Sequence, residues 1–174
     1  MDRNGPIGFF DSGLGGISIL RGTRRLLPAE DYLYYGDSFH APYGVRSAEE
    51  VQMLSRAITE HLLERGAKAI VIACNTATSA AQAALQEAYP DIPVIGIEPA
   101  IAEGVRLFPN GHVGALATPG TLKGKRFLEN KARLEGDCRI TAIPAYKLAF
   151  LYIFQEILQS RNSFSCCAIE VNLI

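Results

Sequence analysis

The sequence predicts an α/β fold in which helices cover both faces of a parallel β-sheet. Five short apolar runs recur along the chain without polar alternation, which is typical of strands buried on both faces. Helical patterns separate these runs, as the crossover connections of a parallel sheet require. Hydrophobic residues make up 48% of the 174 residues and charged residues 20%. This composition is typical of a globular protein with a core.

The expected strands and helices alternate along the first part of the chain. A helix over 17–27 stops before Pro28. Ser47 and Glu50 form a capping box at the start of a helix that ends at Gly66. The apolar runs predict strands over residues 7–10, 32–35, 69–73, 94–97 and 113–117.

A third helix is expected over 77–89, ended by Pro90, and the chain then passes between two lobes near Pro99. After residue 145 the pattern changes to a segment that is apolar around its whole helical circumference. Such a segment is typical of a chain cut short or shifted out of its frame. We therefore expect three parts, which are a first α/β domain over 1–98, the beginning of a second over 99–145, and an off-pattern apolar tail over 146–174.

Charge and composition exclude several classes of function. With Lys+Arg 17 against Asp+Glu 18, the net charge of -1 provides no field that would bind nucleic acid. No apolar run approaches the ~20 residues of a membrane helix, and no signal peptide is evident, so a cytoplasmic protein is expected. Four cysteines without a CxxC pair and three scattered histidines predict neither a disulfide framework nor a metal site.

Small polar residues follow the expected strands. Because ligands bind at the carboxyl ends of parallel strands, this edge is where we expect a functional site. Capping of the following helices would explain many of these residues equally well. The residues at the strand ends are Asp11, Ser12, Asp37, Cys74, Asn75, Thr76, Glu98, Thr118 and Thr121.

Cys74 is different from its neighbours because we expect no capping role for a cysteine. It follows a buried strand and precedes a helix whose N–H groups and dipole favour a thiolate. We interpret it as an activated nucleophile or base, and a buried inert cysteine is the alternative. With Asp11 beside it, the thiol predicts proton transfer or acyl chemistry, and His40 is the candidate base for acyl chemistry.

The strand ends carry almost no lysine or arginine. An anionic ligand would therefore be held by backbone N–H groups, hydroxyls and helix N-termini, which suits an amino or carboxylic acid. The glycines over 13–16 match neither the G-x-G-x-x-G pattern of dinucleotide-binding proteins nor the Walker loop of nucleotide-binding proteins. A cofactor is therefore not expected.

Five motifs together resemble the bacterial glutamate racemases of the aspartate/glutamate racemase superfamily. The resemblance runs from Ile7 to about Ala145, and the ordered set is far more specific than any single motif. The motifs are Phe10-Asp11-Ser12-Gly13-Leu14-Gly15-Gly16, Gly36-Asp37 followed by Pro42-Tyr43-Gly44, Ala73-Cys74-Asn75-Thr76-Ala77-Thr78, Gly96-Ile97-Glu98-Pro99-Ala100 and Ala117-Thr118-Pro119-Gly120-Thr121.

The resemblance implies two flavodoxin-like domains facing each other across a cleft. It also implies a cofactor-independent isomerase that interconverts L- and D-glutamate with two cysteines, and so supplies D-glutamate for peptidoglycan, cell wall biogenesis and cell shape. Cys74 would be one of the two catalytic thiols, with Asp11 assisting its proton transfer. The residues implied to hold the substrate are Asp11, Ser12, Tyr43, Gly44, Asn75, Thr76, Thr118 and Thr121.

The sequence departs from the family at the second catalytic cysteine, which belongs to a Cys-Thr-His motif that this chain lacks. Cys138, Cys166 and Cys167 stand in other contexts and do not match it. We therefore expect racemisation by this chain to be very slow or undetectable. Two alternatives stay open, a non-catalytic amino-acid-binding or regulatory fragment and a cysteine hydrolase that uses Cys74 and His40. Glutamate is the expected small-molecule partner, and a homodimer is left open.

Overall fold

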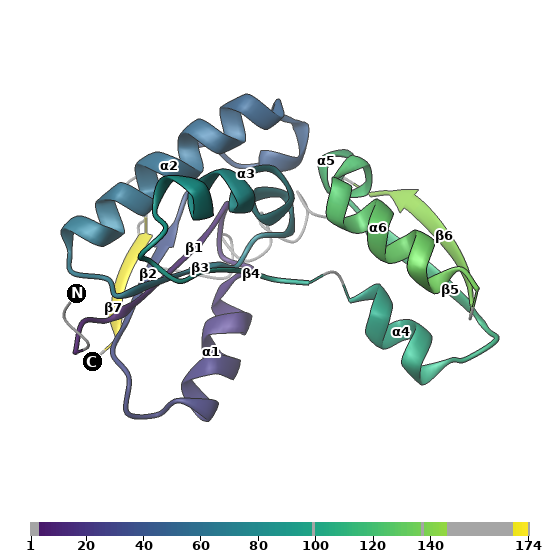
Figure 1. The fold of residues 1–174 in the computed structure, drawn as a ribbon, viewed down its shortest axis with the longest axis horizontal. Coiled ribbons are helices and arrows are strands. Elements are labelled where there is room, and N and C mark those ends of the chain that lie inside the picture. The colour runs from purple at the N-terminus through teal and green to yellow at the C-terminus, as the bar shows by residue number, and fades with distance from the viewer. Residues whose placement is uncertain (1–3, 99, 137, 146–168, 174) are drawn as a thin grey trace, which may run out of the picture.

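The computed structural model describes residues 4–98, 100–136, 138–145 and 169–173, which form two lobes joined after β4 (Figure 1). The elements of the first lobe are β1 (Ile7–Asp11), α1 (Ile17–Leu26), β2 (Tyr32–Gly36), the 3-10 helix η1 (Tyr43–Val45), α2 (Ala48–Glu64), β3 (Ala69–Ile72), α3 (Asn75–Ala88), β4 (Val94–Gly96) and β7 (Ile169–Leu173). Those of the second lobe are α4 (Ile101–Leu107), β5 (His112–Ala117), α5 (Pro119–Lys123), α6 (Lys125–Leu134) and β6 (Arg139–Pro144).

The first lobe contains the predicted parallel sheet. Its strands lie in the order β4-β3-β1-β2-β7, and the first four of these run parallel. The order β2-β1-β3-β4 is that of a flavodoxin-like sheet, in which a ligand crevice opens between the ends of β1 and β3. The α/β class expected from the sequence is thus confirmed.

The fifth strand of this sheet comes from the tail and was not expected. β7 pairs antiparallel with β2, so that Tyr32 faces Leu173 and Gly36 faces Ile169. The sheet is therefore mixed, with one antiparallel strand at its edge. The rest of the expected tail, residues 146–168 and 174, lies outside the described residues.

Helices cover both faces of the first sheet, with α2 and α3 on one side and α1 on the other (Figure 1). Side chains alternate between the faces along β1. Phe10 packs into the core cluster that contains Leu62 and Ile72, whereas Phe9 packs with Leu20 on the α1 side. The continuous apolar runs of the sequence follow from this burial on two faces.

The ends of α2 match the predicted signals. The Glu50 N–H donates to Ser47 Oγ at 3.1 Å, and the Ser47 N–H donates to Glu50 Oε2 at 3.1 Å. Gly66 follows the helix with φ +83°, a conformation that glycine adopts at little cost. The capping box and the glycine stop are both confirmed.

The second lobe contains a smaller sheet in which β5 and β6 run parallel. Ile101, Ala115 and Phe127 form one small core, and Val105, Cys138 and Ile140 form another. The expectation that 113–117 is buried on both faces is wrong, because Ala115 alone is buried in β5 and Leu116 is 57% exposed. In the described part of the chain, β5 has one neighbouring strand where β1 has two.

The described helices of both lobes are too short or too polar to span a membrane. Within the described ranges, none combines the length and the apolar character needed to cross a bilayer.

Candidate functional site

A cavity of about 460 Å³ lies between the lobes, at the carboxyl ends of β1, β3 and β5. It opens where the flavodoxin-like strand order places a ligand crevice. Both lobes contribute, and Asp11 provides the charged side chain of the described lining, which holds no lysine or arginine. The lining residues are Asp11, Ser12, Gly15, Ser18, Ile19, Ala73, Cys74, Asn75, Thr76, Ile97, Leu116, Ala117, Thr118, Thr121 and Ala145.

Cys74 is the N-cap of α3. Its sulfur accepts a hydrogen bond from the Ala77 N–H at 3.5 Å, and its thiol donates to Ser12 Oγ at 3.6 Å. Because the sulfur serves as the cap, α3 begins at Asn75, two residues before the expected start. The prediction that a cysteine has no capping role here is wrong.

The electrostatic surroundings of Cys74 also differ from the prediction. Burial, followed by the negative charge of Asp11, raises the pKa of the Cys74 thiol to about 11. The N–H of Ala77 lowers this pKa, as expected at a helix N-terminus, but burial and Asp11 outweigh it. The resting cysteine is therefore a protonated thiol, although the helix N-terminus favours a thiolate as the sequence suggested.

Asp11 lies at the end of β1, 7% exposed, beneath the glycine-rich loop. Its Oδ2 accepts hydrogen bonds from the N–H groups of Gly13 at 3.2 Å and Gly16 at 3.1 Å. Burial raises the pKa of the Asp11 carboxyl, and the bonds from the loop offset part of that rise. Thiol and carboxyl thus act on each other's protonation.

Tyr34 supports the same loop and was missed in the sequence. Its hydroxyl donates to the Gly13 carbonyl at 2.9 Å, and its ring is fully buried on the α1 side of the sheet. Burial raises the pKa of Tyr34, which keeps the hydroxyl protonated as a donor. A tyrosine within a buried apolar strand needs a hydrogen-bond partner, and that requirement is the signal that would have revealed its role.

Three threonine hydroxyls connect the lobes beside the cavity. Thr76 Oγ1 lies 3.1 Å from Thr118 Oγ1 and 3.1 Å from Thr121 Oγ1, and the last two lie 3.1 Å apart. Thr76 belongs to α3, whereas Thr118 caps α5 and Thr121 lies within it. This threonine triangle brings together residues that the sequence assigned to separate motifs.

Two of the expected substrate-binding residues, Tyr43 and Gly44, lie behind the cavity lining. The Tyr43 hydroxyl donates to Asp37 Oδ2 at 2.6 Å, and Gly44 packs against Thr118. Glu98, at the end of β4, pairs with Arg126 at 2.7 Å on the side of α6.

The geometry does not favour the cysteine-hydrolase alternative. His40 Nδ1 lies 2.8 Å from Asp37 Oδ1, whereas the hydrogen bonds of Cys74 join it to Ser12 and Ala77. His40 is also absent from the described residues that line the cavity. The expected pairing of the imidazole with the Cys74 thiol is therefore not formed.

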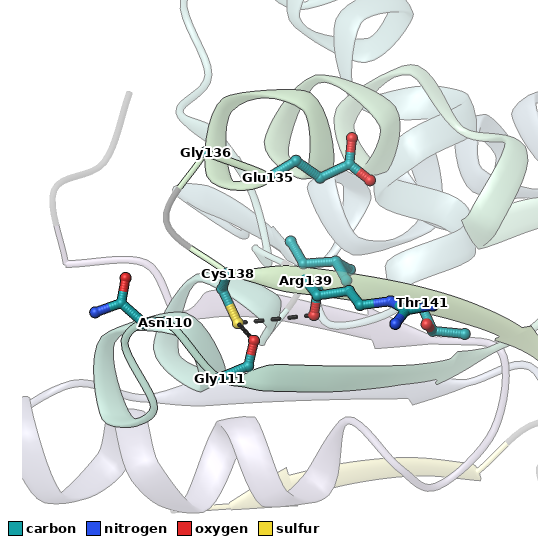
Figure 2. Close-up of a pocket in the computed structure, with 8 residues that line it drawn as sticks. Asn110, Gly111, Glu135, Gly136, Cys138, Arg139 and Thr141 are labelled. Carbon is teal, nitrogen blue, oxygen red and sulfur yellow. Dashed lines mark hydrogen bonds between the residues drawn. The ribbon is translucent and has the colours of Figure 1, made fainter.

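A second cavity, of about 630 Å³, surrounds Cys138 in the second lobe (Figure 2). It lies at the amino ends of β5 and β6, opposite to the edge where parallel sheets bind ligands. The Cys138 thiol donates to the Gly111 carbonyl at 3.0 Å. Its position at the far ends of these strands separates Cys138 from the Cys74 cavity, and Cys166 and Cys167 lie outside the described residues.

The potential metal ligands of the described residues lie scattered. Over these ranges, no three histidine, cysteine, aspartate or glutamate side chains gather closely enough to bind a metal ion.

Comparison with known proteins gives consistent matches. The family model of the Asp/Glu/Hydantoin racemases matches residues 15–147. A glutamate racemase of Clostridium perfringens is 55% identical over 125 residues, which are 72% of this chain and 48% of that protein. The chain spans about half the length of the curated relatives it matches.

Solved structures agree with the sequence matches. The glutamate racemase of Francisella tularensis in complex with D-glutamate superposes with a TM-score of 0.70 and 33% identity, covering 91% of this chain and 59% of that one. The Escherichia coli glutamate racemase in complex with L-glutamate and the activator UDP-MurNAc-ala gives a TM-score of 0.75 and 34% identity, covering 90% of this chain and 65% of that one. Both lobes thus fall within a known architecture.

Proposed function

Because the chain belongs to the Asp/Glu/Hydantoin racemase family, we propose that the cavity between its lobes binds glutamate and that Cys74 transfers the α-proton of the bound amino acid. The observation that carries the proposal is the position of the Cys74 thiol at the β1/β3 crevice, beside Ser12 and Asp11. The product of the complete reaction would be D-glutamate for peptidoglycan. The relatives of known structure that contain D- or L-glutamate support this choice of substrate.

Glutamate suits the polar groups of the cavity. The α-ammonium group pairs with the Asp11 carboxylate, which lies among the lining residues. Hydroxyl and amide groups of Ser12, Asn75 and Thr76 bind the carboxylates from the first lobe, assisted by the N–H groups at the start of α3. Thr118 and Thr121 bind from the second lobe, and Tyr43 and Gly44 act through the turn behind Thr118.

Proton transfer requires the Cys74 thiol to lose its own proton first. A thiol whose pKa is about 11 ionises rarely at neutral pH, so the reaction depends on a change when substrate binds. The ammonium group of glutamate supplies that change, because a positive charge close to the sulfur lowers the pKa of the thiol and offsets the charge of Asp11. The thiol proton passes to solvent through the open cavity. The thiolate then takes the α-proton, which leaves a carbanion on the substrate and a neutral thiol on Cys74.

Inversion requires a second acid on the opposite face of the carbanion. With Cys74 as the acid, the proton returns to the face from which it came, and the amino acid keeps its configuration. When the Cys74 thiol exchanges its proton with water before it returns one, a solvent-derived proton enters one enantiomer without racemisation. The second candidate function is therefore glutamate binding with slow or no inversion, and the observation that favours it is the missing Cys-Thr-His motif.

The experiment follows the two steps separately. Each glutamate enantiomer is incubated with the protein in heavy water, α-deuteration is measured by NMR, and inversion is measured by chiral chromatography. We expect deuteration of one enantiomer with little inversion, and Cys74→Ser should slow it by about 100-fold or more. Cys138→Ser is the matched control, because Cys138 lies in the other cavity.

The outcomes separate the candidates. Efficient inversion would show that a second acid reaches the substrate. Binding of glutamate without exchange in either enantiomer would leave the binding function and contradict proton transfer by Cys74. No detectable binding in calorimetry would overturn the proposal as a whole.

A homodimer stays a prediction, which sedimentation velocity tests.

A further inference from the structure

Asp37 is a buried carboxylate that the proposed chemistry does not use. It follows β2, it is 2% exposed, and its backbone N–H donates to the Asp11 carbonyl at 2.9 Å. Asp37 is not among the described residues that line the Cys74 cavity, and its side chain has two partners on the following loop. The Tyr43 hydroxyl donates to Oδ2 at 2.6 Å, and His40 Nδ1 lies 2.8 Å from Oδ1.

These partners fix the loop that leads from β2 to α2. The His40 carbonyl in turn accepts a hydrogen bond from Arg46 Nε at 2.6 Å. Tyr43 is 1% exposed and packs within the first-lobe core, where burial, followed by its hydrogen bond to Asp37, raises the pKa of its hydroxyl. The hydroxyl therefore stays protonated and donates its hydrogen bond to Asp37 Oδ2.

The fixed loop carries part of the surface on which the second lobe rests, and α3 carries another part. A Cβ atom on Gly44 would lie 2.3 Å from Thr118 Cβ and 2.5 Å from Thr118 Oγ1, so the backbone of η1 directly touches the Thr118 side chain. A Cβ atom on Gly120 would lie 3.4 Å from the Gly44 carbonyl oxygen. α5 thus sits against η1 at the point where it presents Thr118 and Thr121 to the cavity.

We infer that Asp37 is a positioning residue, which holds Tyr43 and thereby seats Gly44 against Thr118, so that the two lobes keep the separation at which the threonine triangle closes beside Cys74. The inference follows from a continuous chain of contacts from Asp37 to Thr118. Loss of the Tyr43 hydrogen bond frees η1, and the lobe that rests on it then moves away from the cavity. Its consequence for glutamate rests on the proposed function, whereas the positioning itself does not.

Access to the Cys74 thiol gives a direct measure of this positioning. The full chain is treated with iodoacetamide, and the alkylation rate of each cysteine is followed by mass spectrometry of its own peptide. We expect Asp37→Ala and Tyr43→Phe each to raise the alkylation rate of Cys74 about tenfold while leaving the rate of Cys138 unchanged. Asp37→Asn keeps an oxygen that accepts from Tyr43, and it should restore most of the protection.

Cys138 separates positioning from general loss of stability, because unfolding of the protein exposes both thiols. Tyr89→Phe is the matched control, since Tyr89 donates its hydroxyl to Glu60 on the protein surface. An unchanged Cys74 rate in Tyr43→Phe would overturn the inference. Cys74 and Cys138 rates that rise together in Asp37→Ala and Tyr43→Phe would overturn it as well.

Glutamate calorimetry distinguishes this inference from the proposed function. If the protein without substitutions binds glutamate, we expect Asp37→Ala to weaken the binding about tenfold and Asp37→Asn to recover most of it. If the protein without substitutions binds no glutamate, the proposed function fails. The alkylation rates of Cys74 still decide whether Asp37 positions the loop. An affinity in Asp37→Ala equal to that of the unmodified protein would contradict the part that concerns glutamate.

Discussion

Strand β1 in the first lobe and strand β5 in the second each precede a site residue, but they differ in how they are packed. β1 lies between β2 and β3, and its Phe9 and Phe10 are fully buried on opposite faces. β5 has β6 beside it within the described sheet, and it buries Ala115 while Leu116 is half exposed. The end of β1 is therefore held by a core that covers both faces of its sheet, whereas the end of β5 is held by a core with few buried side chains.

This difference indicates how each half of the cavity is fixed. Asp11 and Cys74 are held by their own lobe, through the glycine-rich loop and the cap of α3. Thr118 and Thr121 bond to each other within their own lobe, and they are also held from outside it by Gly44 and Thr76. The first lobe therefore acts as the template, and the second lobe takes its position from it.

The largest expected effect comes from deleting a buried ring in each lobe. Phe10→Ala removes a fully buried side chain of the large core and should lower the free energy of unfolding by about 3–5 kcal/mol. Phe127→Ala, in a core with few other buried residues, should cost about 2–3 kcal/mol because its surroundings collapse more easily. Hydrogen exchange measured by mass spectrometry in rising urea reports the stability of each lobe.

The comparison predicts an asymmetric pattern in this experiment. Phe127→Ala should reduce protection in β5 and β6 while β1 and β3 keep theirs, whereas Phe10→Ala should reduce protection in both lobes. Equal loss in both lobes from both variants would show that the protein unfolds as one unit, and the distinction between template and dependent lobe would then be wrong.

Alkaline pH should destabilise the first lobe through Cys74. The thiol has a pKa of about 11 in the folded protein and an ordinary value of 9.0, so the unfolded chain loses its proton first. Folding stability therefore falls as pH rises through the window between these values, by up to about 3 kcal/mol. Urea unfolding measured from pH 8 to 11 checks this.

Cys74→Ser isolates the contribution of the thiol to this alkaline loss. The variant should show a shallower decline from pH 9 upward, with the remaining slope due to buried tyrosines such as Tyr34, whose pKa is also raised. A decline as steep as that of the unmodified protein would show that the buried thiol does not cause the alkaline loss.

Local signals predicted most of the first lobe and failed where distant parts of the chain meet. Ser47 and Glu50 predict the start of a helix because the contacts of a capping box are local in sequence. β7 gave no such signal, since it pairs with β2 through backbone hydrogen bonds between segments far apart in sequence.

The candidate site divides in the same way. The juxtaposition of Asp11 and Cys74 followed from the strand ends of one sheet, but the contact of Thr76 with Thr118 depends on how two lobes dock. The raised pKa of Cys74 could not be predicted either, because burial and a neighbouring carboxylate outweigh the helix dipole that the sequence does reveal.

A smaller effect is expected at the threonine triangle. Thr121→Val keeps the shape of a side chain that is 4% exposed and removes its hydroxyl, so it should cost about 1 kcal/mol and loosen the contact between lobes. Thr141→Val is the matched control, because Thr141 bonds His112 on the exposed surface of the second lobe. Alkylation of Cys74 should accelerate in Thr121→Val and stay unchanged in Thr141→Val. Faster alkylation of Cys74 in Thr141→Val than in Thr121→Val would contradict the idea that the first lobe positions the second through the threonine triangle.

The smallest effect compares one helix glycine from each lobe. Gly22 in α1 has open space where an added methyl group would lie, so Gly22→Ala should stabilise the protein by about 0.5–1 kcal/mol through helix propensity. In α4, a Cβ atom on Gly104 would lie 3.1 Å from Val113 Cγ1, a contact that requires β5 to give way by a few tenths of an ångström. If β5 is as loosely packed as its exposure indicates, Gly104→Ala gains nearly as much as Gly22→Ala in thermal unfolding. A clear loss in Gly104→Ala would instead show that the second lobe resists displacement as the first does, and that its thin core is nevertheless rigid.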